Sequence, residues 1–311
     1  MIEAKNLTKK YGDKTAVDDL TFTVQPGIVT GFLGPNGAGK STTMRMILGL
    51  DAPTRGSVTV GGVPYLKHTK PLQVVGALLE ARAVHTSRSA YHHLLALAAT
   101  HGIAKGRVLD VIDMVGLQEV AHKRAGGFSL GMGQRLGIAS ALLADPETLI
   151  LDEPVNGLDP EGIRWIRDLL KSLAADGHTV FVSSHLMSEM ALTAEHVIVV
   201  GRGRLIADMR MSELIAHASS SVVLVRTPQA SELAVALAGT DITVSRTASE
   251  SLEVMGMTAS EIGDCARDLN ISLHALTSKQ ASLEEAFMEM TRDDVEFHAK
   301  TQADHTLRRA S

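Results

Sequence analysis

The sequence predicts an α/β protein with a mostly parallel sheet and a helical insert, followed by a small α+β domain. An apolar strand runs into a glycine-rich loop and an amphipathic helix over residues 28–50. Continuous apolar runs at 147–154 and 178–185 are typical of buried parallel strands. After about residue 218 a different succession of strands and helices begins. With 311 residues, 45% of them hydrophobic, the chain can build one large core and a second small one.

The elements of the first part follow in order. Runs at 1–13 and 15–24 contain β-branched residues and are broken by turn residues, which predicts strands of an antiparallel β subdomain. Residues from about 87 to 148 show serine starts, apolar spacing of three and four, and glycine stops, which predicts the helical insert. A further helix at 161–177 lies between the two apolar runs. We therefore expect one domain over residues 1–218.

The second part is expected to form an accessory domain over residues 219–291, after a linker of three serines at 219–221. Its elements have the order βαββαβ, which is the ferredoxin-like pattern. The expected strands are 222–226, 242–247, 251–256 and 271–276, and the expected helices are 230–238, 259–269 and a last one within 282–291. The polar stretch 292–311 predicts a flexible tail.

Composition limits the function classes. The formal net charge is −5, which argues against a nucleic-acid partner, since such domains are usually basic. The single cysteine, Cys265, excludes an internal disulfide and fits a reducing compartment. Neither a signal peptide nor an apolar run of about 20 residues is present in the sequence. We expect a cytoplasmic protein that would need another chain to span a membrane.

Residues Gly34 to Ser41, GPNGAGKS, match the phosphate-binding pattern G-x-x-x-x-G-K-[ST] between a strand and a helix. Successive backbone N–H groups and the helix N-terminus would surround the phosphates. Lys40 would bridge the β and γ phosphates, and the Ser41 hydroxyl would bind Mg²⁺. The alternative is an ordinary glycine-rich turn, which the complete pattern in this context disfavours. The fold class is thus a P-loop NTPase core.

Two carboxylates end the apolar run at 147–154. Asp152 and Glu153 would lie at the carboxyl end of a buried strand, where ligands bind in open α/β sheets. Asp152 would hold Mg²⁺, and Glu153 would polarise the attacking water as a general base. Adjacent acids could instead cap a helix, but the phosphate loop favours the catalytic interpretation.

With these motifs, residues 1 to about 215 resemble the ATPase of an ATP-binding cassette (ABC) transporter. The family signature, usually LSGGQ, corresponds to Phe128 through Met132, in which Ser129 and Gly131 are kept while Leu130 and Met132 differ. The form SLGM…QRLGIA and the ending SLEEAFMEMT resemble bacterial drug exporters of the daunorubicin-resistance type. The resemblance implies ATP hydrolysis that powers the export of drugs or other amphipathic compounds.

The resemblance also implies further site residues. His185 resembles the switch histidine beside the base, and Asp159 in NGLDP resembles the D-loop aspartate. Tyr11 resembles the aromatic residue that stacks on adenine, although a plain surface tyrosine is the alternative. The implied ATP-binding set is Tyr11, Val17, Gly34, Pro35, Asn36, Gly37, Ala38, Gly39, Lys40, Ser41 and Thr42.

One position departs from the family. Glu80 stands where a glutamine usually occurs in the loop between the core and the insert. A carboxylate still offers an oxygen to Mg²⁺, so the expected metal ligands are Ser41, Glu80 and Asp152. The charge and the hydrogen-bond pattern of this carboxylate differ from those of glutamine.

The resemblance implies two partners, a second cassette and a membrane permease. Cassettes pair head to tail, so Ser129 through Met132 would cap the γ-phosphate held by the partner's phosphate loop. The alternative is that Ser129 serves only as the N-cap of the following helix. The permease would dock near Glu80 and place the chain peripherally at the cytoplasmic face of the membrane. The other functions considered are a non-transport ABC ATPase acting on ribosomes or nucleic acid, and a P-loop kinase or GTPase.

Overall fold

The computed structural model describes residues 1–80, 84–218, 222–239, 242–279 and the single positions 284, 287, 288 and 291. The chain divides into two compact units, one over Met1–Arg210 and one over Met211–Met290, and each is described by itself. The serine linker at 219–221, the tail at 292–311 and most of the expected last helix lie outside the described residues. Within the described ranges, no helix is long and apolar enough to cross a membrane.

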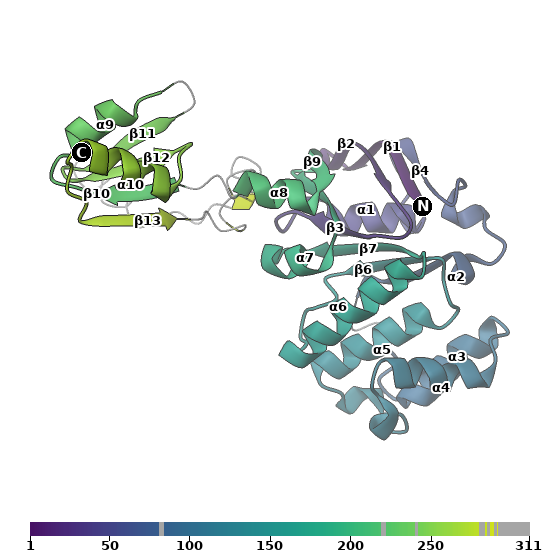
Figure 1. Ribbon diagram of the computed structural model, residues 1–311. Coiled ribbons are helices and arrows are strands. Elements are labelled where there is room, and N and C mark those ends of the chain that lie inside the picture. The colour runs from purple at the N-terminus through teal and green to yellow at the C-terminus, as the bar shows by residue number, and fades with distance from the viewer. Residues whose placement is uncertain are drawn as a thin grey trace, which may run out of the picture. The chain divides into compact units, whose positions relative to one another are not determined.

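The first unit is built on a six-stranded sheet with the strand order β5-β6-β7-β3-β8-β9 (Figure 1). All neighbouring strands are parallel except the edge strand β9, which pairs antiparallel with β8. Every residue of β3 and β7 is buried, as their continuous apolar sequences predict. The strands are β3 (Val29–Leu33), β5 (Val75–Leu78), β6 (Thr148–Asp152), β7 (Thr179–Ser184), β8 (His196–Gly201) and β9 (Arg204–Arg210).

A second, three-stranded antiparallel sheet has the order β2-β1-β4. Its strands are β1 (Ile2–Tyr11), β2 (Lys14–Val24) and β4 (Arg55–Val60). Phe22 of this sheet packs on Phe32 and Phe181 of the six-stranded sheet, with ring centroids 5.8 and 6.0 Å away. This aromatic cluster joins the two sheets into one core.

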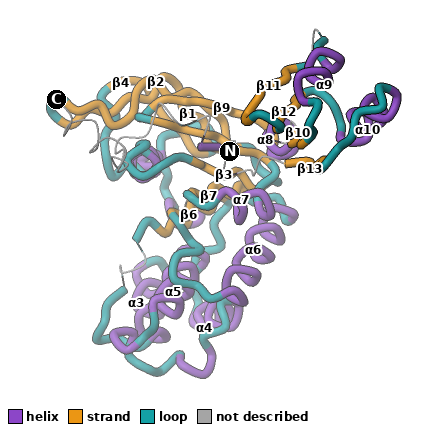
Figure 2. The backbone as a smooth tube through the Cα atoms, turned by 90° about the vertical axis from the view of Figure 1, so that its left-hand side faces the viewer, coloured by secondary structure: helices purple, strands orange, loops and turns teal. Residues whose placement is uncertain are grey.

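Helices cover the six-stranded sheet and form the insert. The helix that follows the phosphate loop, α1 (Lys40–Ile47), contacts β2, β4 and β6, and α6 (Pro160–Ala175) and α7 (Met187–Thr193) pack on β3. The insert contains α3 (Ala90–Thr100), α4 (Lys105–Met114) and α5 (Leu130–Leu142). Helices α3 and α4 lie away from the strands in Figure 2, whereas α5 packs on β5. A short helix, α2 (Pro71–Val74), precedes β5. Ser89 and Ser129 are the N-caps of α3 and α5.

After its first helix, the second unit has the expected βαββαβ order. It begins with α8 (Met211–Ala218), eight residues before the boundary that the sequence suggests. Its antiparallel sheet has the order β11-β12-β10-β13, the strand order of a ferredoxin-like fold, and its core includes Val223, Leu233 and Ile262. The elements are β10 (Val222–Arg226), α9 (Ala230–Leu237), β11 (Thr243–Ala248), β12 (Ser251–Met255), α10 (Ala259–Asp268) and β13 (Ala275–Lys279).

The start of β13 differs from the expected strand at 271–276. Asn270 adopts a left-handed conformation with φ 56°, and the N–H of Ile271 donates to the carbonyl of Ala266 at 2.8 Å. The Ile271 side chain is buried against the end of α10. The apolar residue that resembled a strand start therefore completes the C-terminus of the helix, a role that such residues often have.

Candidate functional site

The site is a cavity at the carboxyl edge of β3 and β6. It brings together the phosphate loop, the two carboxylates and Tyr11, which are far apart in the sequence. The residues lining it are Tyr11, Lys14, Ala16, Pro35, Asn36, Gly37, Ala38, Gly39, Lys40, Ser41, Thr42, Leu79, Leu130, Gln134, Asp152, Glu153 and Asn156.

The phosphate loop needs glycine where its backbone turns. Gly39, directly before α1, has φ 97°, which residues with a side chain rarely adopt. A Cβ atom on Gly39 would lie 2.5 Å from the carbonyl oxygen of Ala16 and 3.2 Å from Val17 Cγ2. Val17 is fully buried and supports the loop from beneath. The first N–H groups of α1 are thereby presented at the cavity, as anion binding requires.

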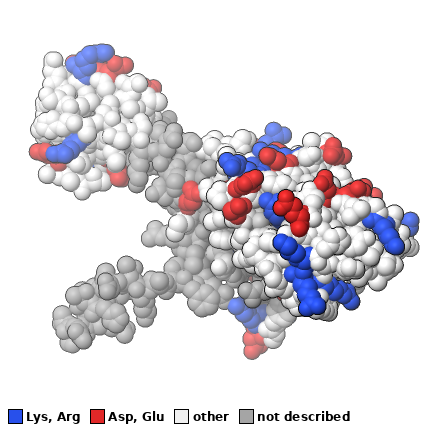
Figure 3. All heavy atoms as spheres, turned by 90° about the horizontal axis from the view of Figure 1, so that it is seen from below, with Lys and Arg blue, Asp and Glu red and all other residues white. Residues whose placement is uncertain are grey.

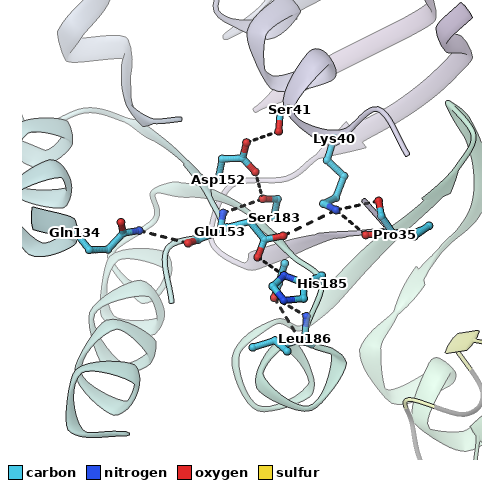
Figure 4. Close-up of polar contacts among 11 residues, drawn as sticks. Pro35, Lys40, Ser41, Gln134, Asp152, Glu153, Ser183, His185 and Leu186 are labelled. Atoms are coloured by element: carbon cyan, nitrogen blue, oxygen red, sulfur yellow. Dashed lines mark hydrogen bonds and ion pairs between the residues drawn. The ribbon is translucent and has the colours of Figure 1, made fainter. Parts of the chain in front are cut away.

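Lys40 extends across the loop. Its ammonium Nζ donates to the carbonyl oxygens of Gly34 at 2.6 Å and Pro35 at 3.3 Å and lies 3.9 Å from Glu153 Oε1 (Figure 4). Burial lowers the pKa of Lys40, and the charges of Glu153 and Asp152 oppose that shift. The positively charged Lys40 side chain therefore lies in the cavity, beside the loop that would bind phosphates.

Asp152 is tied to both neighbouring elements. Its Oδ2 accepts a 2.6 Å hydrogen bond from the Ser41 hydroxyl, and its Oδ1 accepts one from the Ser183 hydroxyl. Because Asp152 and Ser183 are register partners in the parallel pair β6 and β7, both reach the same edge. Mg²⁺ prefers oxygen ligands and is usually bound by one or two protein groups together with phosphates. The Ser41 hydroxyl and the Asp152 carboxylate fit that requirement.

Glu153 has the position of an oriented base. His185 Nδ1 lies 2.8 Å from Glu153 Oε2 (Figure 4), and Ser183 Oγ accepts a 3.0 Å hydrogen bond from the Glu153 N–H. Glu153 has φ 49°, an uncommon conformation for this residue type, and such strain clusters at functional sites. The carboxylate is thus fixed by its backbone and by an imidazole, as a general base requires.

The signature segment has contacts within its own chain. Ser129 Oγ accepts from the Met132 N–H at 3.2 Å and so caps α5. A Cβ atom on Gly131 would lie 2.8 Å from the carbonyl oxygen of Gly157, and one on Gly157 would lie 2.4 Å from Leu130 Cγ. Leu130 also lines the cavity. The segment therefore packs directly on the backbone of the D-loop.

Eight expected site residues are not among those that line the cavity: Val17, Gly34, Glu80, Ser129, Gly131, Met132, Asp159 and His185. Asp159 is the N-cap of α6, where its Oδ1 accepts from the Gly162 N–H at 2.8 Å. Glu80 lines a different groove, between the core and the insert, that also includes Arg45, Leu50 and Leu97. The structure thus brings Ser41 and Asp152 together, whereas Glu80 faces the insert.

Sequence reasoning missed six residues of the site. Lys14, Ala16, Leu79, Gln134 and Asn156 line the cavity, and Ser183 contacts two of its residues. Ser183 holds both Asp152 and the Glu153 N–H, and the signal that it gave was a small polar residue ending an apolar strand. Gln134 is buried and donates from Nε2 to the Glu153 carbonyl oxygen at 3.4 Å, while its Oε1 has no hydrogen-bond partner among the described residues. A glutamine at the start of an apolar helix was the available signal for this residue.

Comparison with known proteins agrees with this geometry. Residues 17–156 match the family model described as ABC transporter, and residues 221–284 match a domain of unknown function, DUF8746. The bacitracin transport ATP-binding protein BcrA of Bacillus licheniformis is 45% identical over 217 residues, which are 69% of this chain and 71% of that protein. The lantibiotic transport ATP-binding protein SrtF of Streptococcus pyogenes is 36% identical over 67% of this chain and 90% of that protein.

A solved structure gives the same result for the fold. A dimeric ATP-binding cassette in a post-hydrolysis state, bound to ADP and Pi, superposes with a TM-score of 0.62 at 26% identity. The match covers 68% of this chain and 99% of that one. The chain belongs to the ATP-binding proteins of ABC transporters. It is an ATPase, and the resemblance inferred from the sequence motifs is confirmed.

Proposed function

We propose that this protein powers the export of peptide antibiotics or other amphipathic compounds through a separate membrane permease. The observation that supports this proposal is the edge of the sheet, where Lys40 and Ser41 of the phosphate loop lie beside Asp152 and the Glu153–His185 pair. Relatives named for bacitracin and lantibiotic transport support the substrate class. Acidic and basic side chains are interspersed on the face shown in Figure 3.

The chemistry follows from the cavity. The backbone N–H groups of the phosphate loop and the Lys40 ammonium bind the phosphates, and Lys40 exchanges its carbonyl partners for phosphate oxygens. Ser41 and Asp152 would hold Mg²⁺, which when bound would neutralise charge on the phosphates. Glu153 accepts the proton of the attacking water, and His185 keeps the Glu153 carboxylate oriented. Tyr11 provides a ring for the adenine base.

A second cassette completes the site. Ser129, Gly131 and the N-terminus of α5 bind the γ-phosphate on the partner's phosphate loop, so ATP drives head-to-tail pairing and hydrolysis releases it. The permease docks in the groove that Glu80 and Leu97 line, at the cytoplasmic face of the membrane. An amphipathic helix with apolar anchors would suit that groove.

The test compares wild type with Lys40→Ala. Each form is expressed in an antibiotic-sensitive bacterium together with the permease that co-purifies with the wild-type chain. Wild type should raise the inhibitory concentration of bacitracin or a lantibiotic, while Lys40→Ala, which should bind ATP weakly, should not. Active ATPase without protection against any such compound would refute export of this class. ATP affinity unchanged in Lys40→Ala would refute the assignment of the phosphate loop.

A further inference from the structure

The turn after α1 is fastened to the end of β1, where Tyr11 lies. Lys9 Nζ donates to the carbonyl oxygen of Ala52 at 2.7 Å, and the Lys10 N–H donates to the Thr54 hydroxyl at 3.0 Å. The Thr54 N–H in turn donates to the Thr8 carbonyl at 2.8 Å. These bonds join residues more than 40 positions apart, next to Tyr11, which lines the cavity.

Asp51, in the turn after α1, links this turn to both Tyr11 and Arg45. Its Oδ2 accepts a 2.9 Å hydrogen bond from the Tyr11 hydroxyl and a 2.7 Å hydrogen bond from Arg45 Nε. The Asp51 side chain is only 18% exposed, so it is largely shielded from water. A carboxylate that accepts from a guanidinium makes a stronger bond than a neutral acceptor does.

The protonation states favour both bonds near neutral pH. The hydrogen bond from Arg45 holds the pKa of Asp51 below its usual value, and the Tyr11 hydroxyl adds to that effect. Desolvation raises the pKa of Tyr11, and the hydrogen bond to Asp51 raises it further. Asp51 is therefore ionised while Tyr11 keeps its proton, which is the arrangement that the bond needs.

Tyr11 lies at an exposed strand end. It is the last residue of β1, is 48% exposed, and lines the cavity that contains the phosphate loop. Lys9 Nζ lies 4.9 Å from the centroid of its ring, which places a cation against the ring. The bond from the Tyr11 hydroxyl to Asp51 fixes the far end of the ring, so its orientation is set before a base arrives.

We propose that Asp51 is a positioning residue for nucleotide recognition, because it holds the Tyr11 ring in place as the platform for the base. The inference rests on the proposed contact between Tyr11 and adenine. A preorganised ring does not pay the ordering cost of one side chain on binding, which corresponds to about a two- to tenfold gain in affinity. The gain applies to ligands with a base and not to phosphates alone.

The test measures the binding of Mg·ATP and of Mg·tripolyphosphate, which has no base, to the full chain by titration calorimetry. Tyr11→Phe keeps the ring and removes the tether, Asp51→Ala removes the anchor, and Tyr11→Ala removes the platform. Tyr11→Phe and Asp51→Ala should each weaken ATP binding about two- to tenfold and leave tripolyphosphate binding unchanged. The double variant should be no weaker than either single variant.

Asp18→Ala is the matched control, since it removes another arginine-paired carboxylate, with Arg204 Nη2 at 2.8 Å, outside the cavity lining. It should bind both ligands as wild type does.

If Tyr11→Ala leaves ATP binding unchanged, the base platform in the proposed function is wrong. If Tyr11→Ala weakens ATP binding but Tyr11→Phe and Asp51→Ala do not, the platform stands and the role of Asp51 is overturned. Equal loss of ATP and tripolyphosphate in Asp51→Ala would overturn it as well.

Discussion

The carboxyl edge of the core sheet and the signature segment differ in what a single chain shows. At the edge, the functional groups already contact one another, as in the 2.6 Å bond from Ser41 to Asp152 and the 2.8 Å contact between His185 and Glu153. In the signature segment, the Ser129 hydroxyl accepts from the N–H of Met132 in its own helix. When one chain contains a whole site, its structure shows the contacts between the reacting groups. When a site is shared between two chains, the structure of one chain shows only the conformation of its own half.

The packing of Leu130 and Gly131 on Gly157 adds to this contrast. The signature segment and the D-loop are the two segments expected to face the partner cassette, and they contact each other in one chain. A shift of either segment would displace the other, because so close a contact leaves no free space. We therefore expect the half site to behave as one unit.

The largest effect should come from Glu153→Gln at the edge. Loss of one oriented general base commonly costs about 10²–10⁴ in rate, and ATP binding should remain because the phosphate loop is unchanged. Steady-state ATPase assays measure the rate, and size-exclusion chromatography with ATP should show a trapped dimer. Turnover close to wild type would remove Glu153 from its role as base.

Ser129→Arg should give the next largest effect and separates the two regions. ATP should bind the monomer with wild-type affinity, whereas turnover should fall by about 10²–10³, comparable to the loss of a transition-state donor. The arginine would block the approach of α5 to the partner's γ-phosphate. If the variant still dimerises with ATP and hydrolyses it normally, Ser129 is only a helix cap.

A mixture of Ser129→Arg and Lys40→Ala chains tests the shared site directly. Each hybrid dimer contains one site with both lesions and one site with neither. Where one intact site suffices for hydrolysis, the mixture should regain ATPase activity that neither variant has alone. Recovery would show that the two loops complement each other across chains.

The interlock of the half site can be tested by Gly157→Ala. The new Cβ would lie 2.4 Å from Leu130 Cγ on a backbone with φ 79°, so the free energy of unfolding should fall by about 1–3 kcal/mol. Leu130→Ala in the same chain removes the clash and should restore part of that loss. Chemical denaturation measures the free energy of unfolding of Gly157→Ala and of the double variant. Equal stability of Gly157→Ala and wild type would show that the contact is loose.

The same contrast explains what sequence could predict. Lys40, Ser41, Asp152 and Glu153 were predictable because each belongs to a short local motif whose spacing implies the chemistry. Ser183 and Gln134 were not, because their roles depend on strand register and on how α5 packs against the Glu153 backbone. Asp51 contacts Tyr11 across 40 positions, which no local pattern reveals.

The second unit shows the same limit for the fold. The order of its elements followed from periodicity and was correct. The start of β13 was wrong, because Ile271 could serve a strand or the end of α10 equally well in the sequence. Tertiary packing decided between the two, as it commonly does for short apolar runs.

The smallest effect on stability, and the sharpest comparison, comes from two serine caps. Ser129 and Ser89 each accept a hydrogen bond from a helix N–H at 3.2 Å, from Met132 and His92 respectively. Ser129→Ala and Ser89→Ala should each lower the free energy of unfolding by about 1 kcal/mol, the usual cost of a lost N-cap. Ser89 also contacts His92 Nδ1 at 2.8 Å, so its loss should be at least as large.

Their effects on turnover should differ. Only Ser129 is expected to bind the partner's γ-phosphate, so only Ser129→Ala should lower the ATPase rate, by about tenfold for one lost hydrogen bond to a charged group. Ser89→Ala should hydrolyse ATP as wild type does, although it is equally destabilised. Denaturation and ATPase assays on the same preparations separate the two quantities. If both variants lose stability alike and neither loses turnover, the hydroxyl of Ser129 serves its own helix and nothing beyond it.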